Sequence, residues 1–203
     1  MSSRDDILAS IRANRPQVKR SLLETPLFDA NRPSSLLAAF KENLERMGGI
    51  FLEPPASGER LAPVYDRIAN ATVVCSTAPE VAGTRNIAAT VQPQDLADVD
   101  FAVVRASFGV AETGSVLLGD RELCVNALAY LAQHLIVLLD PADIVVNMHH
   151  AYRRPEFKTG HYCAFHTGPS ATADIEGVLI HGAQGVRSLC VVPIPKSETE
   201  AVP

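Results

Sequence analysis

The segment that most constrains the fold of this chain is residues 134–139, where every residue after the histidine is leucine, isoleucine or valine. A strand with apolar side chains at successive positions is buried on both faces, as strands of parallel sheets are. Residues 101–104 and 189–194 form similar apolar runs. Upstream, a helix-like segment is twice followed by a strand-like run, which is typical of parallel α/β sheets. The sequence therefore predicts an α/β fold, with a parallel or mixed sheet flanked by helices.

Helix boundaries and hydrophobic periodicity predict the remaining elements. We expect helices from Ser34 or Ser35 to Gly48 and at residues 58–69, 123–133, 142–151 and 170–181, and strands at 50–52, 72–75, 116–118 and 161–166. A short amphipathic helix and a proline-containing stretch come first. The chain thus divides into an N-terminal helix and extended arm (1–33), an α/β domain (34–195) and a flexible tail (196–203).

Composition argues against several classes of protein. The net charge of -5 and the pI near 5.7 disfavour a broad nucleic-acid interface, which needs a basic face. The longest apolar run, residues 135–139, is too short to cross a bilayer. Residues 1–6 lack the basic and apolar regions of a signal peptide. We therefore expect a cytoplasmic protein without a membrane span.

The four cysteines are widely separated in the sequence, at Cys75, Cys124, Cys163 and Cys190. No pair has the spacing of a sequence-local iron–sulfur or structural zinc site. All but Cys124 lie in apolar, strand-like runs, where a free thiol usually packs as a small hydrophobic group. We expect this chain to bind no cofactor by itself and any redox centre to lie on a partner.

The first site-like segment begins at Gly168-Pro169, between a strand-like run and a helix-like one. Backbone N–H groups at the start of a helix have no intrahelical partner and can bind an anion. Gly168, Ser170 and Thr172 are therefore candidate substrate-binding residues, and Asp174 is a candidate acid or base. In the alternative interpretation, Ser170 or Thr172 only caps the helix.

The second site-like segment is the Glu-Thr-Gly-Ser sequence at residues 112–115, between two predicted strands. A carboxylate on a glycine-flanked turn can act as a base, as a nucleophile or as an acceptor for a substrate hydroxyl. Glu112 is therefore a candidate catalytic residue, with Thr113, Gly114 and Ser115 as candidate substrate-binding residues. In the alternative interpretation this is an ordinary hairpin turn with a solvated glutamate.

Ligand sites in open α/β sheets lie at the carboxyl ends of parallel strands. We expect the 112–115 turn and the 168–174 turn to converge there on a small carboxylate such as a 2-hydroxy acid. A metal site drawing on His161, His166 or His181 with Asp174 is an alternative. Our interpretation has no metal.

The residues around both turns are similar to those of a known family. Gly-Val-Ala-Glu-Thr-Gly-Ser-Val-Leu-Leu at 109–118 and the segment from Gly-Pro-Ser-Ala-Thr-Ala-Asp-Ile-Glu at 168–176 to His-Gly-Ala-Gln-Gly-Val-Arg-Ser-Leu at 181–189 resemble the LUD-domain family. Within it they resemble the YkgG-like group, lactate-utilisation protein C, as does Asp-Asp-Ile-Leu-Ala-Ser-Ile-Arg at 5–12. The sequence departs from that pattern at Ala171, where a basic residue is common, and at Ala183-Gln184.

The resemblance implies a Rossmann-like fold similar to the sugar-phosphate isomerase and CoA-transferase-like group. It also implies a role in oxidising L-lactate to pyruvate, together with an iron–sulfur protein and a second cysteine-rich protein that carry the clusters. In the CoA-transferase branch a glutamate on a glycine-rich loop is the nucleophile, and Glu112 is its potential counterpart. Two hypotheses stay open: a subunit of an electron-transfer complex without its own redox centre, and a stand-alone isomerase or acyl-transferase that uses Glu112 on an anionic small molecule.

Overall fold

A computed structural model describes residues 3–16, 21, 23–87, 92–158, 162–169, 171–173, 179–181 and 185–196. Its central sheet has five strands, all parallel, in the order β1-β11-β6-β3-β2. Their bounds are β1 Ile50–Phe51, β2 Val74–Ser76, β3 Phe101–Arg105, β6 His134–Leu139 and β11 Ser188–Pro193. The predicted α/β class with a parallel sheet is confirmed.

The β6 strand lies at the centre of this sheet because its side chains supply apolar surface to both faces. Leu135 and Val137 belong to one buried cluster, while Ile136 and Leu138 belong to another on the opposite face. All of them are fully buried. Alternation of side chains along a strand thus converts a continuous apolar run into two cores.

A second, mixed sheet of four strands has the order β7-β4-β5-β8. Its strands are β4 Phe108–Val110, β5 Ser115–Gly119, β7 Ile144–Val145 and β8 Cys163–His166. The pairs β4–β5 and β5–β8 are antiparallel, whereas β4–β7 is parallel. Every residue of β5 is buried. Val116 and Leu118 pack into the main core, and Leu117 packs with Phe108 on the other face.

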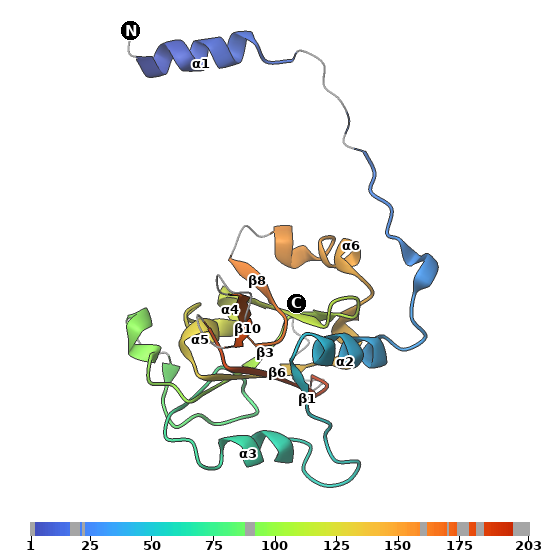
Figure 1. Ribbon diagram of the computed structural model, residues 1–203, viewed down its shortest axis with the longest axis vertical. Coiled ribbons are helices and arrows are strands. Elements are labelled where there is room, and N and C mark those ends of the chain that lie inside the picture. The colour runs from blue at the N-terminus through green and yellow to red at the C-terminus, as the bar shows by residue number, and fades with distance from the viewer. Residues whose placement is uncertain are drawn as a thin grey trace.

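Helices separate and cover these sheets, as Figure 1 shows. Figure 1 places α3 on the outer face of the central sheet, α2, α4 and α5 on its other side near the second sheet, and α6 beyond that sheet. Their bounds are α2 Leu36–Arg46, α3 Ala62–Ile68, α4 Asp120–Leu123, α5 Leu128–Leu131 and α6 Met148–Ala151, with short 3-10 helices at Asp29–Asn31, Pro93–Leu96, Pro141–Asp143 and Pro155–Lys158.

The predicted start of α2 is confirmed, because the Ser35 hydroxyl accepts a hydrogen bond from the backbone N–H of Ala38 at 3.2 Å. At the N-terminus, α1 (Ser3–Ala13) has no buried residue and lies apart from the rest of the protein (Figure 1). Among the helices that the structure describes, none is long and apolar enough to cross a membrane.

Three predicted helices are wrong in whole or in part. Of the predicted 123–133 helix only α5, Leu128–Leu131, is helical, because α4 already ends at Leu123, where Cys124 adopts a positive φ of 57° that interrupts the helical path. In the 142–151 segment, Asp140 caps a 3-10 turn as its side chain accepts from Ala142 N, but β-branched Ile144 and Val145 then pair with β4 as β7. Within this segment only Met148–Ala151 is α-helical.

The 170–181 segment departs most from the prediction. Where the structure describes it, this segment is a two-stranded antiparallel pair, β9 (Ala171–Ala173) with β10 (Leu179–His181). Thr172 and Ile180 are opposite one another in the ladder, and both are β-branched residues that favour strands. The hydroxyl-rich sequence after Gly168-Pro169 therefore leads into a strand and not into a helix.

The last turn of α2 lies directly against two turns of the second sheet. Gly114 has a φ of +66°, and a Cβ on it would lie 2.1 Å from the backbone N of Leu44. Gly168 has a φ of +65°, and a Cβ there would lie 2.2 Å from the carbonyl oxygen of Met47. Neither position can hold a side chain unless α2 moves, so the two glycines set where the end of α2 packs.

We expect Gly114→Ala to lower the free energy of unfolding, measured by urea denaturation, by at least about 2 kcal/mol more than Gly58→Ala does. Gly58 is the matched control, because it also has a positive φ, +97°, but a Cβ there meets nothing within 4 Å. Both substitutions strain the backbone, whereas only the first pushes a methyl group into α2. Equal losses in the two variants would show that the close packing of α2 is not what Gly114 provides.

Candidate functional site

The structure brings the 112–115 turn into contact with Thr167, the residue before the Gly168-Pro169 turn. The Ser115 hydroxyl is hydrogen-bonded to the hydroxyl of Thr167, and the Thr113 hydroxyl lies 2.7 Å from Ser115 Oγ. Ser115 starts β5, and Thr167 directly follows β8. The turns meet at the carboxyl ends of β4, β7 and β8 in the second sheet, and not at those of the central parallel sheet as expected.

Glu112 lies at the tip of the β4–β5 turn and is exposed. Its backbone N–H donates to the carbonyl of Val146 at 3.1 Å, which ties the turn to the residue after β7. Its Oε2 accepts a hydrogen bond from the backbone N–H of Met148 at 3.0 Å. The carboxylate is thus held at one oxygen and can accept further hydrogen bonds from a ligand.

The end of α2 contributes a guanidinium group that the sequence did not single out. Arg46 donates to Asn43 Oδ1 at 2.8 Å and to Glu42 Oε1 at 2.7 Å, which leaves other N–H donors of the group for a ligand. Asn43 in turn donates from Nδ2 to the carbonyl of Ala111 at 2.8 Å. In the sequence Arg46 resembles any cation in the last turn of a helix, so its place beside Glu112 could not be predicted.

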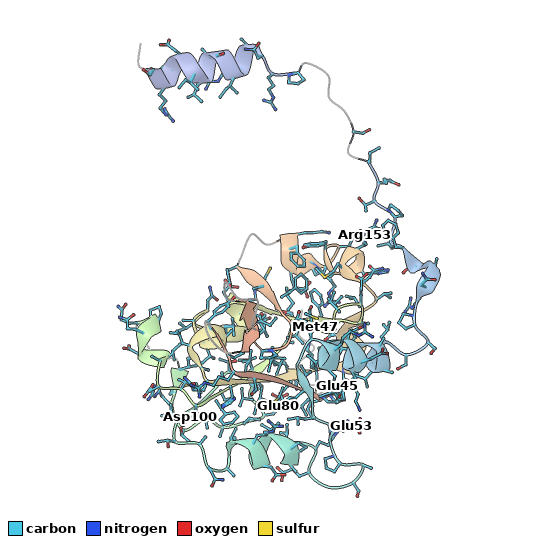
Figure 2. All side chains as sticks on the ribbon, in the orientation of Figure 1. Glu45, Met47, Glu53, Glu80, Asp100 and Arg153 are labelled. Carbon is cyan, nitrogen blue, oxygen red and sulfur yellow. The ribbon has the colours of Figure 1, made fainter. Side chains whose placement is uncertain are left out.

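These groups line one cavity of about 430 Å³. Its wall combines a carboxylate, a guanidinium group, hydroxyl groups and apolar side chains. The lining residues are Asn43, Arg46, Met47, Glu112, Thr113, Ser115, Met148, Phe165 and Thr167. Met47 is labelled in Figure 2 at the end of α2. The cavity can therefore bind a small anion through the guanidinium, accept a hydrogen bond through the carboxylate and cover an apolar group.

The other predicted site residues have different positions. Gly114 and Gly168 are buried turn residues that pack against α2 and do not line the cavity. Thr172 lies on β9. Ser170 and Asp174 lie outside the residues that the structure describes. Because the segment around Thr172 is a strand, the predicted anion site at a helix start has no helix there to support it.

The N-terminal arm forms a further wall beside Glu112. The buried Asn147 donates to the carbonyl of Leu27 at 2.7 Å, and Arg153, labelled in Figure 2, donates to the carbonyl of Thr25 at 2.9 Å. Asp29 lies 2.7 Å from His150 Nε2. The arm lines a neighbouring cavity of about 500 Å³ that shares Asn43, Arg46 and Glu112 with the first one. Part of the segment expected to be an arm thus packs beside the site.

Three histidines were considered as metal ligands in the sequence. Among the described residues, no group of three or more His, Cys, Asp or Glu side chains could hold a metal ion. His161 lies outside the described residues. Burial lowers the pKa of His166 below its ordinary value, and its ring centroid lies 5.3 Å from that of Tyr130. His166 therefore packs in the protein as a neutral imidazole at neutral pH.

Comparisons with known proteins agree with this architecture. The chain is similar to a crystallised DUF162 family protein from Deinococcus radiodurans, with a TM-score of 0.59 and 17% sequence identity over 82% of this chain and 98% of the other. At that identity the likeness supports the fold alone. A search of curated proteins finds no match. The LUD domain model matches residues 81–194, which is more than half of the chain and includes both turns of the site. The protein belongs to the LUD domain family.

Proposed function

We propose that this protein is a lactate-utilisation protein C-like component, of the YkgG-like group, in a system that oxidises L-lactate to pyruvate, and that it binds the substrate. The LUD domain family is associated with lactate utilisation. The observation that carries the proposal is that Arg46, Glu112 and the hydroxyl pair Ser115–Thr167 line one cavity. This set combines a cation for a carboxylate with an acceptor for a hydroxyl, which are the two polar groups of a 2-hydroxy acid.

The orientation of lactate in the cavity follows from these groups. Its carboxylate binds the free N–H donors of Arg46, and its hydroxyl donates to Glu112. Its methyl group packs on the apolar wall that Met148 and Phe165 form. Thr113 and Ser115 supply hydroxyl groups that can adapt as donors or acceptors to either oxygen-bearing group.

Oxidation of lactate to pyruvate removes two electrons and two protons from the substrate. We assign the hydroxyl proton to Glu112, which accepts it as a general base. The two electrons and the second proton pass to acceptors on an iron–sulfur protein and a second cysteine-rich protein. The wide separation of the four cysteines in this sequence supports the assignment of the clusters to those partners. We further propose that the reaction takes place in the cytoplasm.

Arg46→Gln should weaken the binding of L-lactate by about tenfold or more, because it removes a charge-assisted hydrogen bond. Binding can be measured by NMR titration of the purified protein. The matched control is Arg12→Gln on α1, which has no buried residues and should bind like the wild type. Arg46 is exposed, so its replacement leaves the fold intact. Unchanged lactate affinity in Arg46→Gln would contradict the proposed carboxylate site.

The role of Glu112 is tested by lactate turnover with an artificial electron acceptor. We expect turnover only when the iron–sulfur and cysteine-rich proteins are added, and we expect Glu112→Gln to lower it by about a hundredfold or more, as loss of a general base does. Turnover by the isolated chain that disappears in Glu112→Gln would instead favour a self-sufficient enzyme.

A further inference from the structure

A second cavity, of about 280 Å³, lies at the opposite edge of the mixed sheet, where β5 ends and β8 begins. It shares no residue with the cavity around Glu112. Ser107, in the two-residue connection between β3 and β4, and Lys196, which follows β11, both line it. It therefore lies beside the carboxyl ends of the central parallel strands, where open α/β sheets usually bind ligands.

One wall of this cavity is a carboxylate in a fixed position. Glu122 Oε1 accepts from the Ser107 hydroxyl at 2.7 Å, and Oε2 accepts from the backbone N–H of Gly119 at 2.9 Å. The carbonyl of Glu122 also accepts from the hydroxyl of Thr77 at 2.6 Å. Within the part of the chain that the structure describes, no basic side chain forms an ion pair with this half-buried carboxylate. A cationic group on a ligand would supply the missing charge.

The basic side chains that line the same cavity are Arg121, Arg154 and Lys196. Arg154 donates to Glu156 Oε1 at 3.0 Å, and its guanidinium lies over the Phe108 ring at 5.0 Å. Arg154 and Lys196 also lie 3.8 and 2.7 Å, respectively, from Asp143. The Nε of Arg154 is buried and finds no hydrogen-bond acceptor among the described residues. This atom is closed off from solvent, so a ligand carboxylate would meet the terminal N–H donors that Glu156 and Asp143 leave free.

Cys163 also lines the cavity, and the pKa of its thiol is affected by the charges nearby. Burial raises the pKa of Cys163, and the negative charges of Glu122, Asp120 and Glu156 raise it further. These three carboxylates disfavour a further negative charge near the thiol and favour a positive charge there. This cavity thus differs from the one around Glu112, which has a single carboxylate and an apolar wall formed by Met148 and Phe165.

We propose that this second cavity binds a small zwitterion, namely a free amino acid. Its ammonium group donates to Glu122 and to the Ser107 hydroxyl oxygen, and its carboxylate accepts from Arg154 and Lys196. The volume of about 280 Å³ is just below the range of about 300–1,000 Å³ for ligand pockets, which favours a compact amino acid. A 2-hydroxy acid has no ammonium group and would leave Glu122 without a cation.

L-alanine and L-lactate provide a direct test, because alanine has an ammonium group where lactate has a hydroxyl group and they are otherwise the same. Each is titrated by NMR into the full-length wild type, Glu122→Gln and Glu112→Gln. We expect Glu122→Gln to weaken alanine binding by about tenfold or more and to leave lactate binding unchanged. Glu112→Gln should have the reverse effect, so failure of lactate binding and failure of this inference are distinguishable.

Lys196→Gln is a second variant, which keeps the test valid if Glu122→Gln is poorly folded. Lys196 lies on the surface and pairs only with Asp143 through its side chain in the described residues, so its loss should leave the fold intact. It should weaken alanine binding and not lactate binding. Alanine that shows no saturable binding, or binds equally well to wild type, Glu122→Gln and Lys196→Gln, would overturn the inference.

Discussion

The close approach of α2 to the two glycine turns is the constraint on which the candidate site depends. Gly114 and Gly168 admit the backbone of α2 where any side chain would keep it away. Because the helix packs at this distance, Asn43 reaches the carbonyl of Ala111 and Arg46 lies in the wall of the Glu112 cavity. The two turns supply acceptors and hydroxyl groups, and the helix supplies the cation.

The mixed sheet connects this site to the rest of the fold. Only two residues separate β3 from β4, so the central sheet passes almost directly into the mixed one. The buried β5 strand then runs from Ser115, in the Glu112 cavity, to Gly119, in the Glu122 cavity. Two cavities of different character therefore lie at the two ends of one rigid strand. One combines Arg46 and Glu112 with an apolar wall and suits a lactate-like anion, and the other is lined by several acidic and basic side chains and suits a zwitterion.

Much of the central sheet could be predicted from the sequence, because a strand such as β6 is apolar on both faces and has no other stable environment. Glu112, Thr113 and Ser115 could be singled out as candidates because a polar turn between two apolar strands is a local signal. The β9–β10 pair was missed, since hydroxyl and acidic residues after Gly-Pro favour a helix start as strongly as a strand. Arg46 and Glu122 were missed because their surroundings come from segments far away in the sequence.

The most direct test of this account is a crystal structure of the full chain with L-lactate. The account predicts electron density for lactate in the cavity around Glu112, with its carboxylate on the guanidinium of Arg46 and its hydroxyl within hydrogen-bond distance of the Glu112 carboxylate. Lactate bound elsewhere, such as beside Glu122, or bound with its carboxylate away from Arg46, would contradict the central claim that the α2 end and the two turns form the substrate site.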